Sequence, residues 1–462
     1  MENIGAAVCF LSPRPGGYGY LMTNPFGFGP SGPFDMNALG QALQQLGQMM
    51  QASQGQDGPV QWAVVEDVAR KAVPAGANAS VSQAQREAVA SAVSLADLWL
   101  DEAVTFPAAP GPSEAWTRVE WIERTGPVWR RVVSPIAEKV TGAVANVVPG
   151  SGELEDISAE DVSALLPEQL RDMMPEGVPA EFMQMLKPML DMVKQLGSAA
   201  FSMQVGQVLA GLSEQVLCLS DIGIPLLDPP KVALVPENVS KFAESLGVSG
   251  SDALMFVALR EAAHQRLFAH VPWLAARVMG SVEQYASHMD VDGDRLEEAL
   301  HDVDMTNPGA LQEILAGGLL NVEDSSEQKA ALARLEALLA CIEGWVDEVV
   351  QQAATDRLPS FSSLTESMRR RRASGGPAEK TFASMLGMEL RPRQLREAHT
   401  VFAAIRSQRG SYDRDALWSH PDLLPGAEEL ADPLGFVASS GQVPDTLEGW
   451  DDPVGDARDD EE

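Results

Sequence analysis

The chain has 462 residues, of which 45% are hydrophobic, so it is long enough to bury a sizeable core in roughly two or three domains. Its 66 acidic and 33 basic residues give a formal net charge of −33, which argues against binding to nucleic acids or to anionic membranes. No apolar run approaches the roughly 18 residues of a membrane span, and the apolar stretch 4–11 follows Glu2 rather than a basic segment. We therefore expect a cytoplasmic protein without a signal peptide.

The first 150 residues divide into a polar segment and a helical region. Residues 1–58 are rich in Gly, Pro, Met and Gln, which predicts disorder apart from a short amphipathic stretch at 36–50, and Met22 is an alternative start of translation. Residues 59–150 form the predicted N-terminal helical region. Its helical patterns cover 60–72, 82–103 and 128–147, with breaks near Pro74, Pro107 and Pro127.

The main predicted domain covers 151–440, and an acidic, disordered tail follows at 441–462. The domain begins with an acidic connection and a Met-rich helical pattern at 182–217. Strand-like runs are scarce, the clearest being 232–235 before Pro236. The predicted fold class is therefore mainly α, with at most a small β element. The three cysteines, Cys9, Cys218 and Cys341, form no C-x-x-C pair, which favours neither disulfides nor a cysteine zinc site.

The functional prediction depends on residues 249–271. Ser249 followed by Asp252 predicts a capping-box start of a helix, and Pro272 predicts its end. A buried stripe is expected from apolar residues at helical spacing, namely Leu254, Val257, Ala258, Phe268 and Val271.

Charged side chains lie on or beside this apolar stripe. Glu261 and His264 are three residues apart and share one helix face, with Arg260 one turn before His264. The five residues R-E-A-A-H at 260–264 differ in one position from the H-E-x-x-H motif, in which two histidines bind zinc and the glutamate activates a water molecule. Arg260 replaces the first ligand and cannot bind a cation.

A second long helix is predicted at 326–354, with an apolar stripe at Leu332, Leu335, Leu339, Ile342, Val346 and Val349. Glu343 lies 79 positions after His264, and Asp347 follows it by one turn. With 260–264, this Glu-x-x-x-Asp pair resembles the later helix of the zincins. There the glutamate is the third metal ligand and the aspartate orients a histidine.

These stretches resemble the zincin-like metallopeptidase type 2 family. Its actinobacterial members are described as hydrolases or zinc-dependent metalloproteases, and the family is related to proteins associated with deazaflavin-coenzyme biosynthesis. The resemblance extends from Asn24 to Phe436 and is strongest at NPFGFG (24–29), LREAAHQRLFAHVPWL (259–274), EGWVDEVV (343–350), the segment 369–398 and ALWSHPDLLP (416–425). It implies a zincin-like helical domain, with zinc as the possible cofactor.

Three functional hypotheses follow. In the first, the protein is an active zinc metallopeptidase: His264 and Glu343 bind the metal, Glu261 is the base and Asp347 orients His264. The candidates to replace the lost ligand are His270, His288 and His301. In the second, Arg260 pairs with the carboxylates in place of the metal, peptidase activity is reduced or lost, and the cleft binds a peptide or protein. In the third, the protein is a non-enzymatic scaffold or interaction protein with a structural charge network. None of the three predicts a particular oligomeric state.

Further patterns allow two interpretations each. The run 232–235 is either an edge strand that pairs with substrate or a connecting segment. Four arginines at 369–372 form either a phosphate or nucleic-acid site or a helix end that pairs with acidic groups. His399 is interpreted as structural. The sequence DVDGD at 290–294 lacks the Gly and Glu positions of a calcium loop and predicts an acidic turn.

Overall fold

The computed structural model describes residues 58–73, 80–147, 180–288, 325–373 and 394–440. The chain divides into two units, Met1–Asp57 and Gly58–Glu462, and all described residues belong to the second. The predicted disordered segments, the acidic turn at 290–294 and His301 lie outside them. The boundary near residue 150 stays a prediction. No helix among the described residues is long and apolar enough to cross a membrane.

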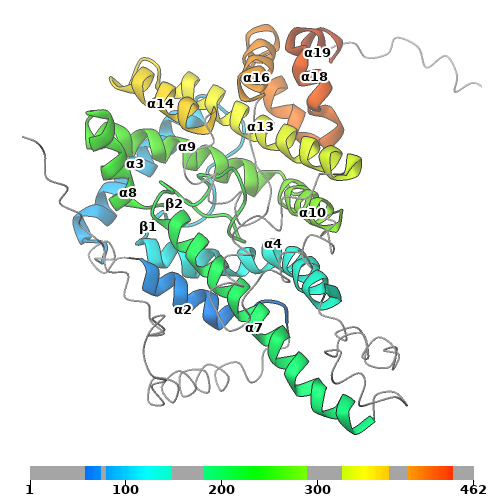
Figure 1. The fold of residues 1–462 in the computed structure, drawn as a ribbon. Helices are drawn as coiled ribbons and strands as arrows, with labels where there is room; N and C mark the ends of the chain where they lie inside the picture. Colours follow the sequence, from blue (N-terminus) through cyan, green and yellow to red (C-terminus); the bar gives the residue numbers. More distant parts are fainter. Residues whose placement is uncertain (1–57, 74–79, 148–179, 289–324, 374–393, 441–462) are drawn as a thin grey trace, which may run out of the picture. The chain divides into compact units, whose positions relative to one another are not determined.

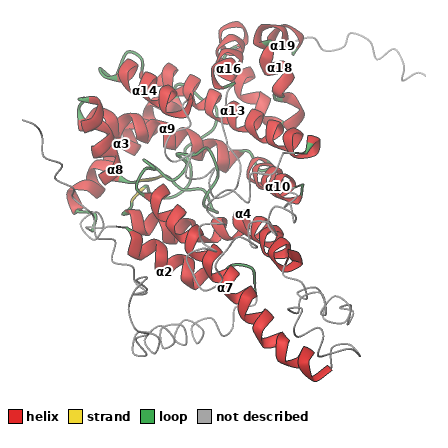
Figure 2. Ribbon diagram, viewed as in Figure 1, coloured by secondary structure: helices red, strands yellow, loops and turns green. Residues whose placement is uncertain are grey.

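Helices account for most of the described chain, which confirms the predicted mainly α class (Figure 2). The longer helices, shown in Figure 1, are α2 (Trp62–Ala72), α3 (Gln83–Asp101), α4 (Arg118–Val147), α7 (Ala180–Ser213), α8 (Pro236–Leu246), α9 (Gly250–His270), α10 (Leu274–Ser287), α13 (Ser326–Ala354), α14 (Phe361–Ala373) and α16 (Leu395–Arg409). Short elements close the described chain: α17 (Ser411–Ala416), η2 (Leu417–Ser419), η3 (Pro421–Leu423), α18 (Ala427–Ala431) and α19 (Pro433–Ser439). Buried apolar side chains between Val60 and Val437 form one continuous core.

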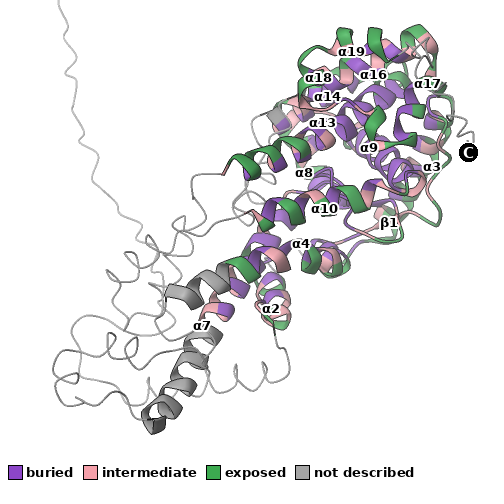
Figure 3. Ribbon diagram, turned by 90° about the vertical axis from the view of Figure 1, so that its right-hand side faces the viewer, coloured by how far each residue is buried: buried purple, intermediate pink, exposed green. Residues whose placement is uncertain are grey.

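Helix α9 is the central element, since it packs against α3, α8, α13 and α14. Its buried residues run without interruption from Met255 to Phe268. Figure 3 colours the described chain by burial. The predicted stripe is buried apart from the half-buried Leu254, but burial extends beyond it because neighbouring helices cover α9 on all sides. Ser249 is the N-cap residue, as predicted, but the predicted capping box is wrong: the Ser249 side chain makes no capping bond, and Asp252 Oδ2 instead accepts a hydrogen bond from Ser360 N at 3.2 Å.

Helix α4 continues through the position where the sequence predicted a break. Pro127 and Pro135 both lie inside it. A proline in a helix interior removes one backbone hydrogen bond and costs about 3 kcal/mol in isolation. Trp121 and Trp129, one on each side of Pro127, are completely buried. Their packing against the core offsets the local cost, which proline spacing alone does not reveal.

The only sheet in the described residues joins β1 (Glu114–Ala115) and β2 (Ala233–Leu234) in parallel. On one side of β2, Trp116 N donates to Leu234 O at 2.8 Å. On the other, Leu219 N donates to Ala233 O at 2.9 Å. Both edges of β2 are thus paired within the chain. The interpretation of 232–235 as an open edge strand for substrate is therefore wrong, because its backbone groups already have partners.

Candidate functional site

The structure brings Arg260, Glu261 and His264 of α9 beside Glu343 and Asp347 of α13. Their exposed fractions are 3%, 0%, 1%, 1% and 4%, in that order. Such groups are stable in a protein interior only when they are paired and hydrogen-bonded. The contacts between them therefore determine what the site can do.

Arg260 bridges the two carboxylates of α13. Its Nη2 atom lies 2.6 Å from Glu343 Oε2, and its Nη1 atom donates to Asp347 Oδ1. The guanidinium carbon also lies 5.9 Å from the ring centroid of Phe256. A planar fork that spans two carboxylates suits arginine, whose donors diverge at fixed angles. The guanidinium thus lies between the carboxylates, as the second hypothesis expected.

His264 is held at both ring nitrogens. Nε2 lies 2.9 Å from Glu343 Oε1, and Nδ1 lies 2.9 Å from the backbone oxygen of Arg260. Both neighbours are oxygen atoms within hydrogen-bond distance, so each ring nitrogen of His264 is already engaged within the protein. A histidine that binds zinc must instead present a lone pair to the metal. In this structure both ring nitrogens of His264 face protein groups, which leaves no ring nitrogen open to a metal.

Glu343 is shared by three basic groups. In addition to Arg260 and His264, Arg372 Nη1 lies 2.8 Å from Glu343 Oε1. Burial acts to raise the pKa of Glu343, but the charges of Arg372, His264 and Arg260 outweigh it and lower the pKa to about 2. Both carboxylate oxygens are engaged, and the group is ionised at neutral pH.

The arginine run at the end of α14 lies against this site. Arg369 Nε is 2.9 Å from Asp347 Oδ2, and Arg371 Nη2 is 3.0 Å from Asp221 Oδ2. Arg370 instead forms an exposed pair with Glu366 at 2.7 Å. The interpretation of 369–372 as a helix end that pairs with acids matches these contacts. The sequence did not predict that the acids would include Asp347 and Glu343. The available signal was the i, i+3 spacing of Arg369 and Arg372, which places them on one helix face.

Asp347 is likewise ionised. Burial opposes ionisation, but Arg260 and Arg369 hold the pKa of Asp347 below its ordinary value. Arg260, His264, Glu343, Asp347, Arg369 and Arg372 are called the Arg260 cluster below.

Glu261 faces away from the Arg260 cluster toward a loop that the sequence did not implicate. Its Oε2 atom accepts from Ser220 N at 3.0 Å, and its Oε1 atom accepts from Gln265 Nε2 at 2.8 Å. Burial raises the pKa of Glu261, although His264 and the hydrogen bonds from Cys218, Ser220 and Gln265 act in the opposite direction.

The donor set does not fit a zinc ion. His264 and Glu343 are bonded to each other, and a cation beside them would face the guanidinium groups of Arg260 and Arg372. Across the described ranges, no three His, Cys, Asp or Glu side chains are grouped so that they could hold a metal. A catalytic zinc normally has three protein ligands.

The proposed replacement histidines lie in other surroundings. His270 stacks on Phe106, with ring centroids 6.3 Å apart. His288 has its Nδ1 atom 2.7 Å from Gln284 O at the end of α10.

Comparisons with known proteins agree with the fold. A search of curated proteins gives no match. A crystal structure of a proposed hydrolase with a novel fold from Chloroflexus aurantiacus is similar, with a TM-score of 0.52 and 19% identity over 82% of this chain and 98% of that one. The profile of the zincin-like metallopeptidase family matches residues 60–437. The chain therefore belongs to the zincin-like metallopeptidase family.

Proposed function

We propose that this protein has lost metal-dependent peptidase activity and acts by binding a peptide or a protein segment. The observation that carries the proposal is the contact of Arg260 with both Glu343 and Asp347, at the position that corresponds to the first histidine of the H-E-x-x-H motif. A guanidinium supplies positive charge to the carboxylates but has no lone pair, so it cannot polarise or activate water as zinc does.

Charge balance supports this substitution. Glu343 contacts two guanidinium groups, those of Arg260 and Arg372, whose combined formal charge equals that of a divalent cation. Removal of one partner from a buried ion pair is strongly destabilising, because the other charge stays desolvated. A chain that lost its metal would therefore require a replacement of this kind to keep α9 and α13 together.

The binding part of the proposal rests on the family. The family match extends over residues 60–437, which supports a retained scaffold in which the first histidine of the motif is replaced by Arg260. Peptide chains are the substrates of metallopeptidases, which favours this class of ligand. Because both edges of β2 are paired within the chain, we expect recognition through side chains rather than through added β-pairing.

Peptide-library binding to the full-length protein tests the proposal. We expect saturable binding without added metal and no cleavage of the bound peptides with or without zinc. Glu261→Gln should weaken binding at least tenfold by changing the hydrogen bonds to Ser220 and Gln265. The matched substitution Glu87→Gln, on the exposed surface of α3, should have no effect.

Thermal unfolding of both variants separates a loss of binding from a loss of fold. Zinc-dependent cleavage that disappears in His264→Ala would instead support the active metallopeptidase. If the folded protein binds no peptide, the hypothesis that remains is a role as a scaffold.

A further inference from the structure

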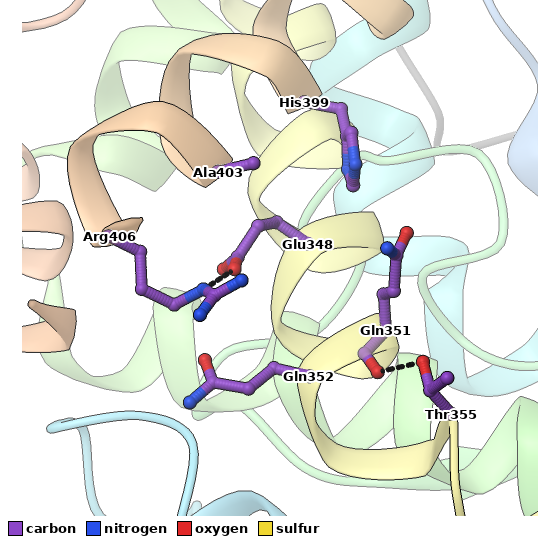
Figure 4. A pocket seen from close by; sticks show the side chains of 7 residues that line it. All are labelled: Glu348, Gln351, Gln352, Thr355, His399, Ala403 and Arg406. Carbon is purple, nitrogen blue, oxygen red and sulfur yellow. Dashed lines mark hydrogen bonds and ion pairs between the residues drawn. The ribbon is translucent and has the colours of Figure 1, made fainter. Parts of the chain in front are cut away.

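A pocket of about 270 Å³ lies between α13 and α16, on a part of α13 that the Arg260 cluster does not use. Figure 4 shows its lining residues: Glu348, Gln351, Gln352, Thr355, His399, Ala403 and Arg406. At 100° per residue, this face of α13 lies roughly a quarter to half a turn around the helix from Glu343. The pocket is therefore distinct from the candidate site of the motif.

The pocket follows from small residues at the contact between the two helices. Gly344 permits a close approach, since a Cβ atom at this position would lie 2.6 Å from Ala398 Cβ. About one turn farther along the contact between α13 and α16, Ala403 faces Glu348, Gln351 and Gln352. Its side chain is too short to fill the space between the two helices. The helices touch at Gly344 and leave a hollow beside Ala403.

The charges in the pocket leave hydrogen-bond donors available. Glu348 accepts from Arg406 Nε and, at 2.6 Å, from Nη1 of Arg414, a residue that also pairs with Asp415, so the carboxylate of Glu348 is already paired within the protein. Among the described residues, the Nη groups of Arg406 have no hydrogen-bond partner. Gln352 Oε1 accepts from Arg414 at 2.9 Å, which leaves its amide nitrogen free to donate.

His399 adds a neutral polar group. Its Nδ1 atom is buried and has no hydrogen-bond partner. Burial lowers the pKa of His399, and Arg369 and Arg406 act in the same direction, while Asp347 and Glu348 oppose it. A lowered pKa keeps the imidazole neutral, so it offers the pocket a hydrogen-bonding nitrogen rather than a charge.

From this lining we infer that the pocket binds a small carboxylate, held by the Arg406 guanidinium and the Gln352 amide. Arginine pairs with carboxylates through parallel hydrogen bonds. The pocket has no Phe, Tyr or Trp side chain in its lining, and its volume lies just below the roughly 300 Å³ at which sites for drug-sized ligands begin. These features favour an aliphatic mono- or dicarboxylate of metabolite size.

Calorimetric titration of the full-length protein with acetate, succinate and L-glutamate tests this inference. We expect at least one of them to bind with a Kd below about 1 mM. The uncharged analogue succinamide and inorganic phosphate should bind at least tenfold more weakly. Saturation by none of the three carboxylates, or equal binding of succinamide or phosphate, would overturn the inference.

Two variants assign the binding to this pocket. Ala403→Leu fills the hollow without changing a charge, and Arg406→Gln removes the donor fork; each should weaken carboxylate binding at least tenfold. The matched substitution Arg396→Gln, on the exposed side of α16, should leave it unchanged. If the Arg406→Gln protein does not fold, carboxylate binding by the Ala403→Leu protein is sufficient to test whether the ligand lies in this pocket. Full affinity in folded Ala403→Leu protein would place the ligand elsewhere.

Discussion

Helix α13 carries two clusters of buried charge, and they differ in what they contain. The Arg260 cluster includes a histidine whose two nitrogens both face acceptors. The second, called the Arg414 cluster, consists of Glu348, Arg406, Arg414 and Asp415, together with backbone and tryptophan donors. Arg414 donates to Ala103 O at 2.7 Å, and Asp415 accepts from Trp345 Nε1 at 2.9 Å.

The difference shows that buried ion pairs alone do not identify a functional site. The Arg414 cluster connects α13 to α17 and to the segment after α3, and it contains no histidine. The Arg260 cluster contains Arg260 and His264, which occupy the two histidine positions of the H-E-x-x-H motif. We therefore assign a structural role to Glu348, Arg414 and Asp415, while Arg406 also supplies donors to the proposed carboxylate pocket, and we assign the family-related role to the Arg260 cluster.

The largest expected effect tests the structural assignment. Arg414→Ala leaves Glu348 with only its Arg406 partner and removes a neighbour of Asp415, so we expect a loss of about 3–5 kcal/mol in the free energy of unfolding. Urea denaturation measures it. The control Arg370→Ala, at an exposed pair, should change stability by less than about 0.5 kcal/mol. Similar small values for both variants would remove the distinction between a buried network and a surface pair.

The next effect is a pH dependence specific to the Arg260 cluster. The folded state lowers the pKa of Glu343 from 4.5 to about 2. A depressed pKa contributes stability that is present above the unfolded value and is lost as the pH falls through the folded value. Wild-type protein should therefore lose about 3 kcal/mol relative to Glu343→Gln between about pH 5 and pH 2.

Denaturation curves at several pH values give this difference, and subtraction of the variant removes the contribution of other carboxylates. Glu261, whose pKa is raised, contributes with the opposite sign in both proteins and cancels. A constant gap between wild type and Glu343→Gln would show that Glu343 is not held as a carboxylate by its three basic neighbours.

The smallest effect concerns the rim of the Arg260 cluster. Arg369 pairs with Asp347 but is 27% exposed, and Asp347 keeps Arg260 when Arg369 is lost. We expect Arg369→Ala to cost about 1 kcal/mol by urea denaturation. A loss as large as that of Arg414→Ala would mean that Asp347 depends on Arg369 rather than on Arg260.

Local signals predicted the helices better than the contacts between them. Helix α13 has the predicted bounds because Ser325 caps its start, accepting from Gln328 N, and its apolar spacing continues to Ala354. Helix α9 lies within the predicted range, yet its burial on all sides depends on α3, α8, α13 and α14, which are distant in sequence. Periodicity describes one helix at a time and cannot predict such packing.

The candidate site shows the same division. The motif spacing predicted Arg260, His264, Glu343 and Asp347 as candidate site residues, and the structure places them together. The motif spacing gave no indication that the loop at Cys218 and Ser220 belongs to the site. The Arg414 cluster was also missed, because it links positions as far apart as Thr105 and Asp415, which are 310 residues apart. Long-range pairs of this kind leave no local pattern in the sequence.

The most direct test of the central claim is the zinc content of protein purified without chelators, measured by mass spectrometry. If Arg260 has replaced the metal, wild-type protein should contain less than about a tenth of an equivalent, whereas Arg260→His, combined with Arg372→Ala to free Glu343, should bind zinc through three ligands. One equivalent of zinc in the wild-type protein, lost in His264→Ala, would contradict the account.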